Sequence, residues 1–384
     1  MTRVYLDHNA TSPLRPEARS AVLAAMDVAG NASSVHREGR RARGLVEEAR
    51  AAVAALVGAD ARCVTFTSGG SEAAATLLSP GFAGRGAAQG PFARLIVSAV
   101  EHSCVLAGGR FPADAVAVCP ADADGRVDLG ALAALLAEDR GPALVAVMAA
   151  NNETGIVQPL AAVAALCRAR GAGFVVDAVQ ALGRMRLDIT ELDCDALFLS
   201  AHKIGAPQGV GAIVTASPAV AFLPLLKGGG QESRRRAGTE NLAGIAGFGA
   251  AARAVEASME PELRRLAALR DSLERRIVTI SPASRIIGLS AERLPNTSLT
   301  VHPGLDGETA AIALDLAGVA VSTGSACASG KVAPSHVLAA MGLPGNEARS
   351  ALRVSLGWST TPEDVESFVA AFAAHVRTIA ARAA

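Results

Sequence analysis

Short apolar runs alternate with helix-length segments from about Arg62 to Thr215, and this alternation limits the possible folds more than any other feature of the chain. The pattern is typical of a mostly parallel sheet covered by helices. We expect strands at residues 64–66, 95–98, 116–119, 144–148, 174–177, 196–200 and 211–214, and helices that include residues 46–57 and 129–136. Strands joined by helical crossovers run parallel, so a ligand is expected at their carboxyl ends.

The C-terminal part shows a smaller version of the same alternation. A helical pattern at residues 262–277 precedes expected strands at 298–301, 319–321 and 352–355 and expected helices at 308–316 and 362–381. Thr361 before Pro362, with acids in the first turn, predicts where the last helix begins. We therefore expect an α/β protein with two domains. Residues 15–258 form a large domain on a mostly parallel seven-stranded sheet, and residues 1–14 and 259–384 form a smaller α/β domain.

Composition narrows the expected partners. The 384 residues are enough for two domains that each bury a sizeable core. With 36 basic and 36 acidic residues the formal net charge is zero, which argues against nucleic acid or an anionic membrane and favours small soluble substrates. No apolar stretch approaches the roughly 18 residues that span a bilayer. The N-terminus lacks the long apolar core of a signal peptide, so we expect a cytoplasmic protein.

The six cysteines contain no Cys-x-x-Cys pair, so we expect neither a disulfide framework nor a structural metal site. Several adjoin apolar runs or lie in a helical pattern, as is typical of buried, inert thiols. These are Cys63, Cys119, Cys167 and Cys194.

Cys327 differs from these cysteines because residues 322–331 are small and glycine-rich. We interpret the segment as an exposed loop, in which a thiol near Lys331 can reach the thiolate form and act as a nucleophile. The alternative is a surface cysteine without a role.

A lysine closes one of the expected strands, where residues 196–199 lead into Ser200-Ala201-His202-Lys203. An isolated lysine is ordinarily a solvated surface charge. At the end of a buried strand, however, partial desolvation lowers the pKa of an amine and makes its neutral, nucleophilic form accessible. Lys203 is therefore a candidate for holding an aldehyde cofactor as a Schiff base.

Two further strand ends carry polar residues that suit the same kind of cofactor. Asp177 ends the run at 174–177, and its carboxylate can pair with a protonated pyridine nitrogen, although it can also simply cap the following turn. Gln180 can then donate to a phenolic oxygen. Asn152, just past another strand, can do likewise or bind a substrate carboxylate.

A glycine-rich turn, Ser68-Gly69-Gly70-Ser71, precedes a helix-forming segment, so its free amides and hydroxyls can hold a phosphate. His102 follows another strand, where an imidazole can stack on a flat ring and transfer protons, or can be purely structural. Lys203, Asp177 and this turn together predict a site for pyridoxal phosphate.

The chain resembles the cysteine desulfurases, pyridoxal-phosphate enzymes of the class V aminotransferase group, and is most similar to their nitrogen-fixation and iron–sulfur assembly branch. The resemblance runs nearly end to end. It rests on residues 5–11, 31–36, 101–102, 151–155, 177–180, 200–203, 236–241 and 324–330. It implies a fold-type I pyridoxal-phosphate enzyme.

The resemblance also implies a role for each candidate residue. Lys203 would bind the cofactor aldehyde, His102 would stack on its ring, Asp177 would pair with its nitrogen and Gln180 would contact its phenolic oxygen. Gly70, Ser71, Ser200 and His202 would hold the phosphate. Thr239 would reach the phosphate of a neighbouring subunit, which implies a homodimer. Asn152 and Arg353 would grip the substrate carboxylate, for which a bidentate guanidinium is well suited.

The implied reaction converts L-cysteine to L-alanine. Lys203 removes the α proton of the substrate, and the Cys327 thiolate attacks the substrate sulfur and becomes a persulfide. The sulfur then passes to an acceptor or iron–sulfur scaffold protein. Rival interpretations are a selenocysteine lyase or another class V lyase or aminotransferase, and a catalytically silent scaffold or sulfur-relay protein.

Three departures from the family pattern stand out. Ser71 replaces a threonine, which keeps the hydroxyl, and alanines at 73–75 replace polar residues. His8 stands where asparagine is commoner. The alanines bear on local packing or on the polarity of the pocket more than on the reaction class.

Overall fold

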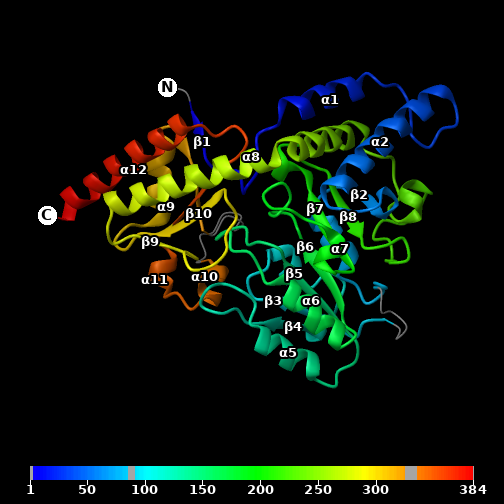
Figure 1. Cartoon of the computed structure of the whole chain (residues 1–384), viewed down its shortest axis with the longest axis horizontal. Helices are drawn as coiled ribbons and strands as arrows, with labels where there is room; N and C mark the ends of the chain where they lie inside the picture. Colours follow the sequence, from blue (N-terminus) through cyan, green and yellow to red (C-terminus); the bar gives the residue numbers. More distant parts are fainter. Residues whose placement is uncertain (1–2, 85–90, 325–334, 384) are drawn as a thin grey trace.

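A seven-stranded sheet forms the centre of the computed structural model, which describes residues 3–84, 91–324 and 335–383 (Figure 1). Its strand order is β2-β8-β7-β6-β5-β3-β4, and all neighbours pair in parallel except β8, which is antiparallel to both β2 and β7. The strands are β2 (Val64–Thr67), β3 (Arg94–Ser98), β4 (Val116–Cys119), β5 (Ala143–Met148), β6 (Gly173–Asp177), β7 (Ala196–Ser200) and β8 (Gly211–Thr215). The expected mostly parallel sheet is confirmed.

Helices cover both faces of this sheet because successive residues of its strands point to opposite sides. In β5, Val145 and Val147 pack into a core shared with α2, α5, α6 and α8, whereas Leu144 and Ala146 pack into a second core shared with α3 and α4. The helices of this part are α1 (Pro16–Met26), α2 (Arg37–Leu56), α3 (Gly70–Leu77), α4 (Ser103–Leu106), α5 (Leu129–Ala137), α6 (Leu160–Ala169), α7 (Ile189–Leu192) and α8 (Leu242–Ile280), with 3₁₀ turns at Ala61–Cys63, Ala113–Ala115, Ala201–Ile204 and Gln231–Arg234.

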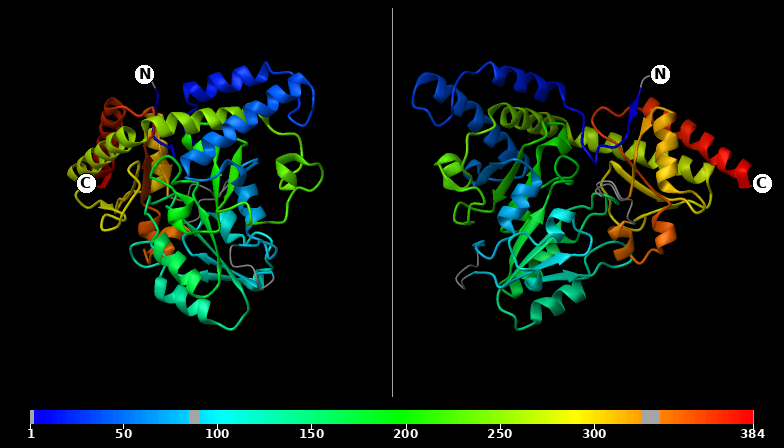
Figure 2. Two further views of the ribbon diagram at one scale, coloured as in Figure 1. Left: turned by 45° about the vertical axis from the view of Figure 1, so that its right-hand side comes forward. Right: turned by 180° about the vertical axis from the view of Figure 1, so that it is seen from behind.

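A smaller antiparallel sheet of order β12-β13-β10-β9 forms the C-terminal domain (Figure 2). Its strands are β9 (Arg285–Ile286), β10 (Thr297–Val301), β12 (Ser322–Thr323) and β13 (Ala351–Ser355), and its helices are α9 (Gly307–Leu316), α10 (His336–Ala340), α11 (Gly345–Ala348) and α12 (Pro362–Ala383). Near the N-terminus, β1 (Val4–Tyr5) pairs with β11 (Val319–Ala320). That pairing supports assigning residues 1–14 to the smaller domain, although the domain limits themselves stay a prediction.

The helix expected at residues 262–277 is longer than predicted, because α8 begins at Leu242 and continues through Pro261 to Ile280. Glycines hide its first half from sequence analysis, since they disfavour a helix. In the fold they allow close packing: a Cβ atom at Gly249 would lie 2.5 Å from Cα of Ala49 on α2. The predicted boundary at 258/259 falls inside α8, which runs from the large sheet to the smaller one (Figure 1).

The helix expected at residues 46–57 likewise begins earlier, at Arg37. The apolar pattern does not predict this first half, because it is polar and largely exposed.

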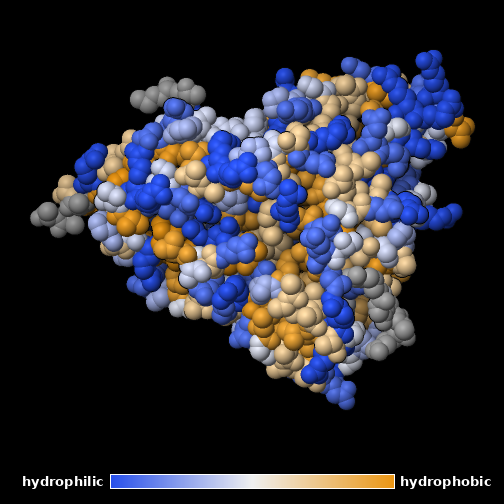
Figure 3. All heavy atoms as spheres, in the orientation of Figure 1, coloured by the Kyte–Doolittle hydropathy of each residue, from blue (hydrophilic) through white to orange (hydrophobic). Residues whose placement is uncertain are grey.

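Hydrophilic and hydrophobic residues are interspersed over the face of the molecule seen in Figure 3. Within the described part of the chain, no helix combines the length and the apolar character needed to cross a bilayer.

Candidate active site

A cavity of ≈ 310 Å³ lies at the carboxyl ends of β3, β5, β6 and β7 and is closed by the N-terminal segment and by β13. It brings together most of the residues that the sequence predicts for the site. These are Gly70, Ser71, His102, Asn152, Asp177, Gln180, Ser200, His202, Lys203 and Arg353. Thr239 is exposed and does not line the cavity of this chain. Cys327 lies outside the described residues.

Lys203 sits in the 3₁₀ turn that follows β7. Its Nζ atom donates to the carbonyl oxygens of Asn9, at 2.7 Å, and Ala10, at 2.8 Å. The turn ends at Gly205, whose φ of 81° is left-handed and favours glycine. A Cβ atom there would also lie 2.7 Å from Cγ of Arg15, so the local fold requires glycine directly after the lysine turn.

Asp177 both caps a turn and faces the cavity, so the two interpretations of this residue are compatible. Its Oδ1 atom accepts a hydrogen bond of 2.9 Å from the Val179 amide. Burial raises its pKa to about 6, and the Val179 hydrogen bond and the Lys203 charge oppose the rise. At neutral pH the side chain is therefore mainly an anion in a cavity wall, where a cationic ring nitrogen would be a favourable partner.

The glycine-rich turn leads into α3, whose N-cap residue Gly69 makes no side-chain capping bond. The first amides of the helix are therefore open to an anion. At Gly70 a Cβ atom would lie 3.1 Å from Cγ2 of Val179, so the absence of a side chain keeps this wall of the cavity open. Ser71 and Ser200 line the same region.

Two histidines of the cavity are held neutral by their surroundings. Burial, followed by the charges of Lys203 and Arg184, lowers the pKa of His202 to about 4, and its Nδ1 atom lies 3.0 Å from Oγ1 of Thr11. Burial, Lys203 and His336 also lower the pKa of His102. The Nδ1 atom of His102 accepts the Cys104 amide at 3.2 Å, which assigns the proton of the neutral ring to Nε2.

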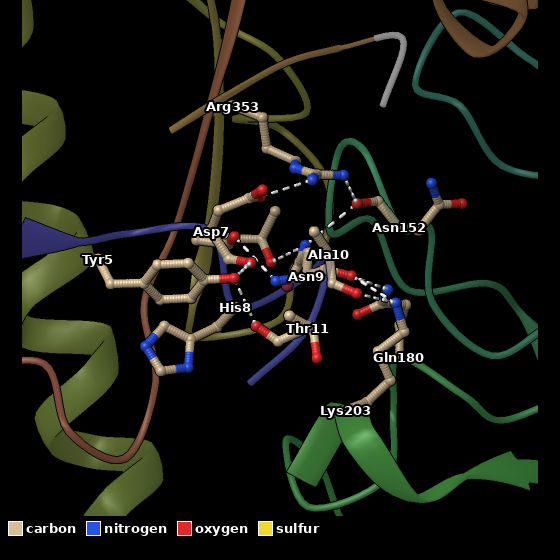
Figure 4. A network of polar contacts seen from close by, with 12 residues as sticks. Tyr5, Asp7, His8, Asn9, Ala10, Thr11, Asn152, Gln180, Lys203 and Arg353 are labelled. Atoms are coloured by element: carbon tan, nitrogen blue, oxygen red, sulfur yellow. Dashed lines mark hydrogen bonds and ion pairs between the residues drawn. The ribbon is translucent and has the colours of Figure 1, made fainter. Parts of the chain in front are cut away.

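Arg353 and Asn152 form the opposite wall. The Arg353 side chain is almost fully buried; its Nη1 donates to the Asn152 carbonyl oxygen at 2.9 Å and its Nη2 to Oδ1 of Asp7 at 2.8 Å (Figure 4). Arg353 Nε and Asn152 Oδ1 are buried and have no hydrogen-bond partner among the described residues. A donor and an acceptor are thus available to a polar ligand.

The sequence prediction missed several residues that line or support the cavity. Asn9, Ala10 and Cys104 line it. Glu101 is fully buried behind it and accepts the Met148 amide at 2.8 Å, and burial and the Asp177 charge raise its pKa well above the usual range. Residues 5–11 carry part of the family resemblance, but their contacts with the cavity join positions far apart in the sequence, which spacing does not predict.

Three of the residues that depart from the family pattern, Ala73, Ala74 and His8, have a structural basis. Ala73 and Ala74 are fully buried in the core on one face of the large sheet, where small apolar side chains fit, and they do not line the cavity. His8 is buried, with Nδ1 2.7 Å from Oγ of Ser12. Its ring fills space left by Gly357, where a Cβ atom would lie 1.9 Å from His8 Nδ1.

Comparison with known proteins agrees with this architecture. The family model "Aminotransferase class-V" matches residues 4–368, so the chain belongs to the class V aminotransferase family. A cysteine desulfurase of Cereibacter sphaeroides is 42% identical over 372 residues, which cover 95% of this chain and 94% of the relative. The cysteine desulfurase IscS of Dictyoglomus turgidum is 38% identical over 94% of this chain and 91% of its own length. Within the class V family, the chain belongs with the cysteine desulfurases.

A solved structure supports the same assignment of fold. The NifS-like protein from Rickettsia africae superposes with a TM-score of 0.87 at 33% identity and covers 98% of this chain and 99% of its own. The expected fold, a large domain with a mostly parallel seven-stranded sheet plus a smaller C-terminal domain, is confirmed.

Proposed function

We propose that this protein is a pyridoxal-phosphate-dependent cysteine desulfurase, which converts L-cysteine to L-alanine and passes sulfur, as a persulfide on Cys327, to an acceptor. The single observation that carries the proposal is the convergence of Lys203, Asp177 and His102 in one cavity opposite Arg353. Membership of the cysteine desulfurases supports the reaction and its use for iron–sulfur cluster assembly.

The residues of the cavity fit pyridoxal phosphate. Lys203 supplies an amine for the aldehyde, and Asp177 supplies a buried carboxylate for the ring nitrogen. The uncapped start of α3, with Gly70 and Ser71, and the side chains of Ser200 and His202 would hold the phosphate. Gln180 would contact the phenolic oxygen and His102 the ring face. When bound, the cofactor supplies an electron sink for negative charge at the substrate α carbon.

Arg353 and Asn152 would bind the substrate carboxylate. The Nε donor of Arg353 is buried and has no partner among the described residues, so a carboxylate oxygen there would satisfy it. Asp7 and the Asn152 carbonyl oxygen already fix the guanidinium in place. Little side-chain entropy is then lost when the substrate binds.

Lys203 and His102 would handle the protons. The Asn9 and Ala10 carbonyls accept hydrogen bonds and cannot donate, so they stabilise the Nζ of Lys203 as an ammonium after it has taken the α proton. In the tautomer assigned to His102, Nε2 carries a proton, so His102 can act there as a proton donor.

The sulfur step is proposed for Cys327. Its thiolate attacks the sulfur of L-cysteine and forms a sulfur–sulfur bond, while the carbon–sulfur bond breaks and its electron pair stays with the carbon. A proton then completes the methyl group of alanine. The net change is one thiol and L-cysteine to one persulfide and L-alanine.

The proposed partners are a second copy of the chain and a sulfur-acceptor or iron–sulfur scaffold protein. Thr239 is exposed in a segment away from its own cavity, which is compatible with its proposed contact with the phosphate of a neighbouring subunit.

The decisive experiment measures sulfide and alanine released from L-cysteine in the presence of a reductant, with the visible spectrum recorded for wild type, Cys327→Ala and Lys203→Ala. We expect equimolar products from wild type, cofactor absorbance without turnover in Cys327→Ala, and an altered spectrum in Lys203→Ala. Unchanged turnover in Cys327→Ala with cofactor bound would instead favour a class V lyase or aminotransferase.

A further inference from the structure

Arg184 is a buried cation behind the cavity. Only 6% of its surface is exposed, and its hydrogen bonds within the described residues go to neutral oxygens. Burial, together with the charge of Arg353, lowers its pKa to about 9, so the guanidinium is still largely protonated at neutral pH. Burying an arginine without a carboxylate contact lowers the stability of the fold, so a functional role for Arg184 is worth seeking.

The first group that Arg184 holds is the amide of Gln180. Its Nη1 donates to Gln180 Oε1, and Gln180 Nε2 in turn donates to the Asn9 carbonyl oxygen at 3.0 Å. A side-chain amide has one oxygen and one NH₂ group, so occupying the oxygen decides the orientation of both. Gln180, which lines the cavity, therefore offers a donor to a ligand, because its acceptor is already engaged by Arg184.

The second group is the backbone around the lysine. Nη2 of Arg184 donates to the carbonyl oxygens of His8, at 2.9 Å, and Lys203, at 3.3 Å, and Nη1 donates to Oδ1 of Asn9 at 2.9 Å. One guanidinium thus joins the N-terminal segment to the lysine turn. Five donors in a rigid plane make arginine suited to this, and lysine could not reproduce it.

We propose that Arg184 is a positioning residue for the bound cofactor: it fixes the Gln180 amide so that an N–H group meets the cofactor's phenolic oxygen, and it places a positive charge behind that amide. This rests on the proposed function of the cavity. An anionic oxygen on the cofactor gains both from the oriented donor and from the nearby cation.

The test measures the dissociation constant of pyridoxal phosphate from the full-length protein by absorbance titration after removal of the cofactor. The variants are Arg184→Met, which removes the charge, and Arg184→Lys, which keeps the charge but lacks the planar set of guanidinium donors. Arg186→Met is the matched control, because Arg186 is two residues away, exposed and paired with Glu260. We expect about tenfold weaker binding for Arg184→Met, a smaller loss for Arg184→Lys and none for the control.

A double-mutant cycle separates positioning from a general loss of structure. Arg184→Met should weaken cofactor binding about tenfold in the wild-type background and by a clearly smaller factor when Gln180→Ala is already present, because only the effect of the charge then remains. An equal factor in both backgrounds, or unchanged binding by folded Arg184→Met, overturns the proposal.

Where Arg184→Met does not give a cooperative melt, Gln180→Glu provides the test. A carboxylate keeps the Arg184 contact but loses the donor, so this variant is expected to fold and to bind the cofactor about tenfold more weakly. Binding as tight as wild type overturns the proposal. Failure of wild type itself to bind pyridoxal phosphate would refute the proposed function instead, so the two failures are distinct.

Discussion

The Nζ atom of Lys203 donates over 2.7 Å to the carbonyl oxygen of Asn9, a residue 194 positions away in the sequence. The side chain of Asn9 meanwhile binds Asn152, Thr297, Asn296 and Arg184. The N-terminal segment is therefore the part that joins the lysine turn of the large sheet to β10 and β13 of the smaller one. A cavity that uses Lys203 and Arg353 together depends on this connection (Figure 4).

Replacing Asn9 with alanine tests that connection. Asn9→Ala removes both an acceptor for Arg184 and a donor to the Asn152 carbonyl oxygen in a buried site. Leaving buried polar groups unsatisfied costs about 1–3 kcal/mol each, so we expect a lower free energy of unfolding and at least tenfold slower sulfide release. Denaturant unfolding and product assays measure the two effects. Wild-type kinetics in a stable Asn9→Ala would show that the segment does not position the lysine.

Buried histidines predict acid sensitivity. Burial lowers the pKa of His8 to about 3, with the charges of Arg184, Arg15 and Arg265 adding to the effect, and it lowers the pKa of His302 to about 4. The ordinary value is 6.5, so in the pH range from 6.5 down to these values the unfolded chain binds more protons than the folded one. Stability is therefore present above pH 6.5 and is lost as the pH falls, by about 1.4 kcal/mol per pH unit for each group.

The variant His8→Asn isolates one of these contributions. Its midpoint of chemical unfolding, followed from pH 7 to pH 4.5, should fall less steeply than that of wild type, because one titrating group has been removed. His36→Asn is the comparison variant, since it replaces an exposed histidine by the same residue. Parallel curves for wild type and His8→Asn would contradict the assignment of a strongly lowered pKa.

The sequence predicts the sheet well because its strands are apolar on both faces, and such runs bounded by glycine and polar residues are recognisable locally. It also predicts the polar residues at the strand ends, since parallel strands bring their carboxyl ends to one edge. It does not predict the start of α8, where close packing against α2 offsets the poor helix propensity of glycine. Nor does it predict the roles of Asn9 and Arg184 around the cavity, because these roles depend on contacts that only the tertiary structure creates.

The cavity lining contains a thiol, Cys104, and this allows a sharp test of which cysteine carries sulfur. Burial, with a contribution from Asp177, raises the pKa of Cys104 to about 12, so its thiolate is scarce at neutral pH. We expect Cys104→Ala to release sulfide within about twofold of wild type, whereas Cys327→Ala releases none. Mass spectrometry of the protein after a single turnover should find the extra sulfur on Cys327. Extra sulfur on Cys104 would overturn this order of reactivity.

Glu153 and Ser335 provide the last prediction, because Glu153 lies close to the described chain on both sides of residues 325–334. Ser335 Oγ donates to Glu153 Oε2 and accepts the Leu338 amide at 3.1 Å, and a Cβ atom at Gly324 would lie 3.5 Å from the same carboxylate oxygen. Glu153 is itself buried and adjoins Asn152 of the cavity wall. Ser335→Ala should therefore slow sulfide release severalfold without changing the affinity for pyridoxal phosphate.

The control for Ser335→Ala is Thr361→Ala, which removes an equivalent helix cap, the 3.2 Å bond from the Asp364 amide, far from the cavity lining. Losing a cap costs about 1 kcal/mol in either variant, and Ser335→Ala also takes a donor from the buried Glu153 carboxylate, so we expect it to lose more stability than Thr361→Ala in denaturant unfolding. Only Ser335→Ala should slow sulfide release, because the bond that it removes ties residue 335 to Glu153, which adjoins Asn152 of the cavity wall. Equal losses of activity in both variants would mean that lower stability alone explains the effect, and that Glu153 holds no special position.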